Sequence, residues 1–155
     1  MEWKMDNNRI TQFQGQYRWL SNFYQTPIEI RGVTFPSVEA AFQATKAIDG
    51  CLDSIFCGLS PGQSKILGKN IRMRDDWDEI KFEVMETLLR IKFQDRELRE
   101  RLINTGDAEL FEGNAHGDIL WGCDWETLQG QNKLGKLLMK LRAEYQAKAN
   151  ANSIN

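Results

Sequence analysis

Histidine is nearly absent from this chain of 155 residues, which contains only His116. The three cysteines, Cys51, Cys57 and Cys123, show no C-x-x-C spacing. Zinc sites take their ligands from closely spaced Cys and His, so we expect neither a zinc centre nor a structural disulfide. A Ser-His-Asp or Cys-His mechanism would depend entirely on His116, whose Gly- and Asn-containing surroundings favour a solvated loop residue.

Other catalytic signatures are also missing. The sequence has no G-x-S-x-G motif, no P-loop, no G-x-G-x-x-G after a predicted strand and no H-E-x-x-H. It also lacks apolar runs of membrane-spanning length and a signal-peptide core near its first residues. We therefore expect a cytoplasmic protein that needs no metal or cofactor, in which carboxylates perform acid–base chemistry and Lys or Arg bind anions.

Length and charge limit the domain organisation and the partners. We expect one domain over residues 9–146, between an N-terminal extension, 1–8, and a polar, frayed C-terminal tail, 147–155. A monomer is favoured. The net charge of −2 gives no general attraction for nucleic acid. Nucleic acid would therefore bind through a local basic patch, consisting of Lys65, Lys69, Arg72 and Arg74.

Hydrophobic periodicity predicts a mostly helical chain with a few strands. One helix is predicted from Ser37 to about Gly50, a short one follows Ser60-Pro61, and the longest covers residues 77–93. A fourth carries Leu98, Leu102 and Ile103 and is closed by Thr105-Gly106, and Leu134 to Tyr145 mark the last. The predicted strands are 9–13, 28–30, 33–35 and 108–112, with 28–35 forming a hairpin around Arg31-Gly32. In the second helix Ile66 and Leu67 are expected to face inward, and in the third Lys81 and Lys92 are expected to flank the apolar face. Residues 17–24 and 113–131 lack a period and are predicted to be ordered loops.

Three polar residues share one side of the helix that begins after the N-cap Ser37. Glu39, Gln43 and Lys46 recur at helical spacing, so their side chains point the same way. A carboxylate, an amide and an ammonium on one stripe suit a polar ligand pocket. The same spacing is also typical of a solvated helix surface, and spacing alone leaves both interpretations open.

Three further polar segments are candidates for ligand contacts. In Ser21-Asn22-Phe23 the amide can read a ligand edge while Phe23 or Trp19 stacks on a ring. In residues 118–122 the Asp118 carboxylate precedes Trp121 and Gly122. In residues 130–135 Asn132 and glycine amides can approach a ribose or phosphate closely. Each also has a structural interpretation: a turn cap for Asn22, core packing for Trp121, and helix capping for Asn132.

Taken together, these segments resemble the NADAR family of YbiA-like N-glycosidases. The match runs in order from about Ile10 to Tyr145. The matching residues are Leu20-Ser21-Asn22-Phe23, Pro36-Ser37, Glu39, Phe42-Gln43, Lys46, Gly68, Trp77, Lys81, Met85, Lys92-Phe93, Thr105-Gly106, Glu112, Asp118, Trp121-Gly122, Gly130, Asn132, Leu134-Gly135, Leu138-Met139 and Arg142. Val38 and Ala40 depart from the Ser-Glu-His of many members, and Cys123-Asp124-Trp125 replaces a Gly-rich turn.

The resemblance implies a mostly helical α+β single domain with a small antiparallel β-sheet. It also implies NAD or ADP-ribose chemistry and cleavage of N-glycosidic bonds. Known activities of the family act on phosphoribosylamino-pyrimidine intermediates of riboflavin biosynthesis or remove ADP-ribose from guanine in nucleic acid. Both substrates have a ribose C1 bonded to nitrogen and a phosphate on the same sugar.

We accordingly predict an N-glycosidase, similar to an ADP-ribosylglycohydrolase, in which Glu39, Lys46 and Asp118 are catalytic. The carboxylates would act as acid, base or oxocarbenium stabiliser. Lys46 would either bind phosphate or attack C1 to form a Schiff base. The predicted substrate-binding residues are Asn22, Phe23, Gln43, Arg72, Trp77, Lys81, Trp121, Gly122 and Asn132. A non-catalytic module that binds ADP-ribose or a related nucleotide is the alternative.

Overall fold

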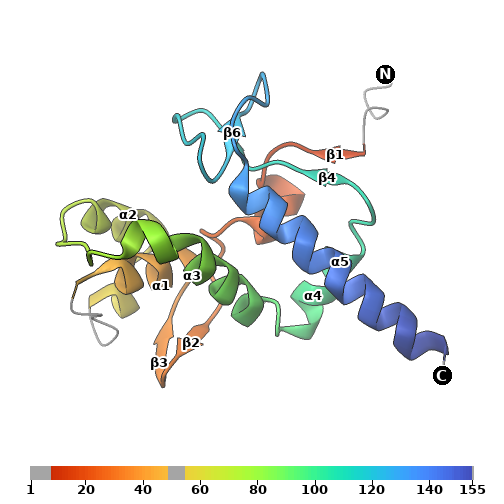
Figure 1. The fold of residues 1–155 in the computed structure, drawn as a ribbon, viewed down its shortest axis with the longest axis horizontal. Coiled ribbons are helices and arrows are strands. Elements are labelled where there is room, and N and C mark those ends of the chain that lie inside the picture. Colours follow the sequence, from red (N-terminus) through yellow and green to blue (C-terminus); the bar gives the residue numbers. More distant parts are fainter. Residues whose placement is uncertain (1–7, 49–54, 155) are drawn as a thin grey trace. The chain divides into compact units, whose positions relative to one another are not determined.

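Helices dominate the computed structural model, which describes residues 8–48 and 55–154 (Figure 1). The chain divides into two units, which we call the central unit, Asn22–Asp95, and the terminal unit, Met1–Ser21 with Arg96–Asn155. Among the described residues the strands form three two-stranded ladders. The predicted mostly helical α+β class is confirmed.

The strand pairing differs in part from the predicted antiparallel sheet. In the central unit β2 (Ile28–Ile30) pairs antiparallel with β3 (Val33–Phe35), as predicted. Arg31 and Gly32 between them have φ values of 51° and 82°, the left-handed conformation of a tight hairpin turn. The ladders of the terminal unit are parallel instead. Alternation along one strand contains no information on the direction of its partner.

Helix α1 (Val38–Lys46) begins where the sequence predicts. The Ser37 Oγ accepts a hydrogen bond from the Ala40 N–H at 3.1 Å, which satisfies one of the amides that the first turn leaves open. The helix ends earlier than predicted, because Ala47 adopts an extended conformation and forms a bridge with Met73. The predicted stop at Gly50 lies outside the described residues, as does Cys51.

A 3₁₀ turn, η2 (Ile55–Gly58), and helix α2 (Pro61–Gly68) follow. Ser60 and Gln63 form a capping box at the start of α2. The prediction that Ile66 faces inward is wrong, because its side chain is 65% exposed. The buried stripe of α2 consists instead of small residues, among them Ser64 and Gly68, which allow close packing on α1.

Helix α3 (Trp77–Lys92) packs on α1 and β2 and buries Trp77, Met85, Leu88 and Leu89. The Trp77 indole lies against the Phe42 ring, with ring centroids 4.8 Å apart. The three helices therefore enclose the apolar core of the central unit, and the polar stripe of α1 is built on that core.

In the terminal unit β1 (Arg9–Ile10) pairs with β4 (Glu109–Leu110), so these strands are shorter than the predicted 9–13 and 108–112. The 3₁₀ helix η1 (Gly15–Leu20) occupies much of the predicted 17–24 loop. Helix α4 (Arg96–Ile103) lies beside α5 (Lys133–Ile154), which also packs on β4 (Figure 1). Within the 113–131 loop, β5 (Gly113–Asn114) pairs with β6 (Cys123–Asp124).

The C-terminal helix is longer than predicted. It continues through most of the 147–155 segment, which the sequence suggested would be frayed. Apart from Asn8, which donates to Asp107 at 3.0 Å, the predicted extension 1–8 lies outside the described residues. Among the helices that the structure describes, none combines the length and the apolar character needed to cross a membrane.

The Ser37 cap yields a prediction about stability. Replacing Ser37 with Ala removes the acceptor of the Ala40 amide inside a fully buried position. We expect the free energy of unfolding to fall by about 1 kcal/mol, measured by urea titration. Ser153→Ala, in an exposed part of α5, is the matched control and should leave the midpoint unchanged. An unchanged midpoint for Ser37→Ala would show that the cap does not stabilise α1.

Candidate functional site

The polar stripe of α1 is buried in the central unit. Glu39 and Gln43 are each 8% exposed, and Lys46 is half-buried. The Gln43 Nε2 donates to Glu39 Oε1 at 2.9 Å, and Lys46 Nζ donates to Gln43 Oε1 at 3.5 Å. The interpretation as a solvated helix surface is therefore wrong. Burial of a carboxylate, an amide and an amine on one stripe requires that they satisfy one another or a ligand.

The surroundings of Lys46 lower the pKa of its amine. Burial lowers the pKa of the Lys46 amine below its ordinary value; Glu39 acts in the opposite direction, and Lys69 lowers the pKa further. A lowered pKa increases the fraction of unprotonated amine, the form that can attack carbon. The stripe thus presents a carboxylate and an amine with nucleophilic potential about two turns apart on one helix.

Asn22 lies next to the first turn of α1. Its backbone carbonyl accepts the Glu39 N–H at 3.1 Å, and its Nδ2 donates to Met85 Sδ at 3.4 Å. The Asn22 Oδ1 is buried and has no partner among the described residues. An unsatisfied buried carbonyl costs roughly 1–3 kcal/mol, so this oxygen is a candidate acceptor for a donor group of a ligand. Ser64 Oγ, in α2, is a second such atom.

The remaining predicted residues of the central unit surround α1 in different ways. Trp77 is buried against Phe42, which accounts for it as core, whereas Phe23 is 38% exposed. The exposed Arg72 belongs to a loop bonded to the end of α1, where its carbonyl accepts the Ile48 N–H at 2.9 Å. Lys81 pairs with Asp78 of its own helix at 3.1 Å. Lys81 thus has a carboxylate partner on α3, whereas the backbone of Arg72 is held next to the end of α1.

Asp118 in the terminal unit organises a turn. Its Oδ1 accepts the N–H groups of Leu120 and Trp121 at 3.2 and 3.0 Å. The Asn114 side chain holds the Asp118 backbone on both sides, accepting from its N–H at 3.0 Å and donating to its carbonyl at 2.9 Å. The Asp118 Oδ2 accepts no hydrogen bond from the described residues. One oxygen therefore supports the turn and the other is available for chemistry.

Asn132 has a clear structural role. Its Oδ1 accepts the Glu112 N–H at 3.0 Å and its Nδ2 donates to the Leu110 carbonyl at 2.9 Å, which ties the start of α5 to the strand region. Gly122 is equally confined, because a side chain there would overlap the Glu112 carbonyl. These contacts explain Asn132 and Gly122 without a ligand. The predicted structural role of Asn132 therefore fits, but its side chain bonds to the strand region rather than capping α5.

Asn114 and its neighbours form a polar cluster that sequence reasoning overlooked. The Asn114 Nδ2 donates to Glu112 Oε2 at 3.1 Å. Burial raises the pKa of the nearby Cys123 thiol, and Glu112 and Asp124 act in the same direction. Residue type alone could not identify Asn114, because a loop Asn is ordinarily a turn residue.

Among the described residues no three His, Cys, Asp or Glu side chains gather in a way that could hold a metal ion.

Lys92 is the second residue that the sequence placed incorrectly. It is 1% exposed rather than flanking the apolar face of α3, and its Nζ lies 5.8 Å from the Tyr24 ring centroid and 5.4 Å from that of Phe93. Burial lowers the pKa of Lys92 to about 7. Helical spacing could have revealed this, since Lys92 follows Leu88 by four residues and Met85 by seven.

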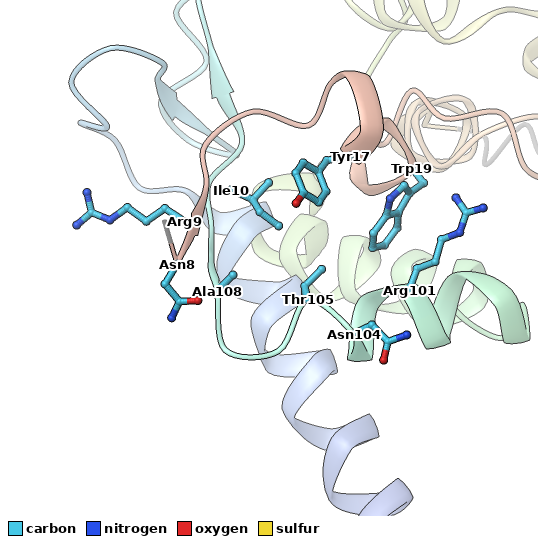
Figure 2. Close-up of a pocket in the computed structure, with 9 residues that line it drawn as sticks. All are labelled: Asn8, Arg9, Ile10, Tyr17, Trp19, Arg101, Asn104, Thr105 and Ala108. Carbon is cyan, nitrogen blue, oxygen red and sulfur yellow. The ribbon is translucent and has the colours of Figure 1, made fainter. Parts of the chain in front are cut away.

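A separate groove of about 410 Å³ lies in the terminal unit (Figure 2). The Tyr17 and Trp19 rings lie between Arg9 and Arg101 in this view. Both arginines form salt bridges within the terminal unit. Arg9 pairs with Glu109 of β4 at 3.4 Å, and Arg101 pairs with Glu97 of α4 at 2.7 Å. The Trp19 Nε1 donates to a backbone carbonyl. Trp19, the alternative to Phe23 as a stacking ring, lines this groove, but none of the predicted catalytic residues does, and we assign no ligand to it.

Comparison with known proteins identifies the family. The NADAR domain model matches residues 10–146. The chain belongs to the NADAR domain family. The N-glycosidase YbiA of Shigella boydii is 39% identical over 132 residues, which cover 83% of this chain and 81% of that protein. A riboflavin biosynthesis protein of Vibrio vulnificus is 36% identical over 140 residues, or 88% of this chain, which spans only 38% of that longer protein.

A solved structure extends the comparison to the fold. The NMR structure of the Escherichia coli protein YbiA superimposes with a TM-score of 0.76 at 32% identity, covering 92% of this chain and 91% of that one. The predicted family and fold class are thereby confirmed. The predicted enzyme class agrees with the N-glycosidase names of the relatives. The individual site residues and the substrate stay predictions.

Lys92 yields a pH-dependent prediction. The folded protein releases the Lys92 proton at about pH 7, whereas the unfolded chain retains it to about pH 10.4, so the unfolded state binds more protons in between. We expect the free energy of unfolding to rise over this range, relative to Lys92→Met, by up to about 1.4 kcal/mol per pH unit. Below pH 7 the folded and unfolded states both bind the Lys92 proton, so the difference in free energy of unfolding between Lys92→Met and the wild type should stop changing with pH. The variant should have its greatest advantage there.

The measurement is urea denaturation of both proteins at matched pH values. Comparison with Lys92→Met cancels the titration of every other group that the substitution leaves undisturbed. A stability difference independent of pH between about pH 7 and pH 10 would mean that Lys92 keeps an ordinary pKa despite its burial.

Proposed function

We propose that this chain is an N-glycosidase that hydrolyses the bond between ribose C1 and a base nitrogen in a phosphoribosylated or ADP-ribosylated base. The buried array of Glu39, Gln43 and Lys46 on α1 is the observation that carries the proposal. Membership of the NADAR family and the N-glycosidase names of its relatives support the reaction type.

Glu39 is the first candidate for the carboxylate that acts at C1. When the C1–N bond breaks, its electrons go to the departing base nitrogen, which takes up a proton, and positive charge develops on C1 and the ring oxygen. An ionised Glu39 stabilises this charge, and a protonated one supplies the proton. Water then attacks C1 and loses a proton to the carboxylate or solvent, giving the free sugar and the free base.

Lys46 has two possible roles in the same reaction. As a cation it binds the phosphate of the substrate, with Lys69 close enough to act on its pKa and so to add charge. As a neutral amine it attacks C1, and the base leaves with the electrons of the C1–N bond and one proton of the amine. The C1–O bond of the ring then breaks, the ring oxygen takes the second proton, and the opened sugar remains attached as a Schiff base. Water hydrolyses that imine and restores the amine. The lowered pKa of Lys46 supports the second role.

Asp118 is the second candidate carboxylate. One of its oxygens accepts two backbone amides, so the other is the oxygen that would act on a substrate. It would serve as acid, base or oxocarbenium stabiliser. Asn22 and Phe23 are proposed to contact the substrate, with Asn22 Oδ1 accepting from a hydroxyl or amino group.

Two substrate classes fit this chemistry. The Vibrio vulnificus relative is named as a riboflavin biosynthesis protein, which favours a free phosphoribosylamino-pyrimidine. The family resemblance also includes ADP-ribosylated guanine in nucleic acid. For the latter, the basic residues Lys65, Lys69, Arg72 and Arg74 would provide the contact with the polymer. A substrate panel containing both classes, scored by chromatography of the released sugar phosphate or ADP-ribose, decides between them.

Carboxylate substitutions provide the direct test of the reaction. Glu39→Gln keeps a hydrogen-bond acceptor for Gln43, and Asp118→Asn keeps an oxygen for the turn, so we expect both variants to fold. Each should lower turnover by at least about a hundredfold, the effect typical of losing an acid–base group. Full turnover in both would refute the carboxylate assignment. Tight binding without release by the wild type would favour the non-catalytic module instead.

Lys46→Arg separates the two roles of the lysine. Arginine keeps the positive charge but cannot form a Schiff base, so substrate binding should partly survive while turnover by the covalent route is lost. Borohydride should trap a sugar adduct on the wild type alone. Trapping should increase with pH and reach half its maximum below the ordinary lysine pKa, because only the neutral amine attacks. Turnover retained in Lys46→Arg would leave phosphate binding as the role.

A further inference from the structure

Gly68, at the end of α2, faces the polar stripe of α1. A β-carbon placed there would lie 2.5 Å from Gln43 Cδ and closer still to Gln43 Oε1. The residue is buried, inside a helix, and its φ is not positive. The backbone therefore does not require glycine, and glycine in a helix is less stable than alanine by roughly 0.5–1 kcal/mol. The absent side chain provides space for the Gln43 amide.

The Gln43 amide has a defined orientation in that space. Its NH₂ group faces Glu39 Oε1 at 2.9 Å, and its carbonyl oxygen faces Lys46 Nζ at 3.5 Å. The two ends of an amide are not interchangeable here, because a carboxylate only accepts and an ammonium only donates. Gln43 thus connects the carboxylate to the amine and occupies the position between them.

We propose that Gly68 is a positioning residue for the proposed N-glycosidase site, where its missing side chain holds open the space from which the Gln43 amide orients both Glu39 and Lys46. The proposal rests on the proposed function only for its catalytic consequence. The structural part of the proposal is that the position of the Gln43 amide depends on Gly68. That part is argued only from the contact between α1 and α2. Nothing in the spacing of Gly68 along the sequence indicates this partner.

The first experiment is independent of activity. In Gly68→Ala the methyl group displaces the Gln43 amide, so its side-chain NH₂ signals in ¹H–¹⁵N NMR spectra should move toward those of a free glutamine and exchange faster with solvent. Gly62→Ala is the matched control in the same helix, because a β-carbon there meets no atom within 4 Å. Gln43 signals that are the same in wild type and Gly68→Ala would overturn the proposal.

The second experiment measures turnover in a double-mutant cycle of Gly68→Ala and Gln43→Ala. Each single variant should lose about tenfold in kcat, the effect of losing one hydrogen bond to a charged group. The double variant should be no slower than Gln43→Ala, because Gly68 acts through Gln43. Gly62→Ala should retain wild-type turnover. Additive losses, or no loss in Gly68→Ala, would contradict the positioning role.

Thermal unfolding separates a local effect from a global one. Gly68→Ala adds a favourable helix residue, so the variant should stay folded, with a circular-dichroism melt close to that of the wild type. If the wild type released no sugar from any substrate, the proposed function would fail, while the NMR result would still decide the dependence of Gln43 on Gly68. The two failures are therefore distinguishable.

Discussion

The close approach of α2 to α1 at Gly68 is the contact on which the polar stripe depends. Apolar packing brings the two helices together, but only a residue without a side chain leaves room for the Gln43 amide between them. The amide in turn determines what its neighbours can do. It gives Glu39 a hydrogen-bond donor in a buried environment and gives Lys46 an acceptor that is neutral, where a direct ion pair would hold the ammonium charged.

Burial acts on charge in two different ways in the central unit. Lys46 is half-buried beside polar groups, and burial lowers the pKa of its amine while Glu39 acts in the opposite direction. Lys92 is enclosed beside aromatic rings, where desolvation lowers its pKa further. The same physical cause therefore produces a reactive candidate in one place and a pH-dependent stability effect in the other. Lys46 is connected to the proposed chemistry by its neighbours Glu39 and Gln43.

Side-chain amides hold the irregular part of the terminal unit in shape. Asn114 and Asn132 bond mainly to backbone groups, replacing the ladder bonds that two-residue strands cannot supply. These bonds explain how the Gly-containing segment 113–131 keeps a defined conformation. It also explains why conspicuous polar residues in a loop are poor indicators of a binding site: their donors and acceptors are often used by the chain itself.

Local signals predicted the elements well and their partners poorly. The Ser37 cap, the Ser60-Pro61 start of α2 and the Arg31-Gly32 hairpin each depend on neighbours a few residues away, and each was correct. Ile66 and Lys92 were placed incorrectly because burial is decided by what packs on a helix. The short β1 and β4 strands are about a hundred residues apart, and no local period indicates that they pair in parallel.

The sequence by itself determined the family, the mostly helical α+β class and the common face of Glu39, Gln43 and Lys46, because helix periodicity and an ordered set of motifs are properties of the chain. The tertiary structure decided that this face is buried, that Gln43 connects its neighbours, and that Gly68 makes room for it. Those facts depend on how closely two helices approach, and that distance is set by side-chain volumes that meet only when the chain is folded.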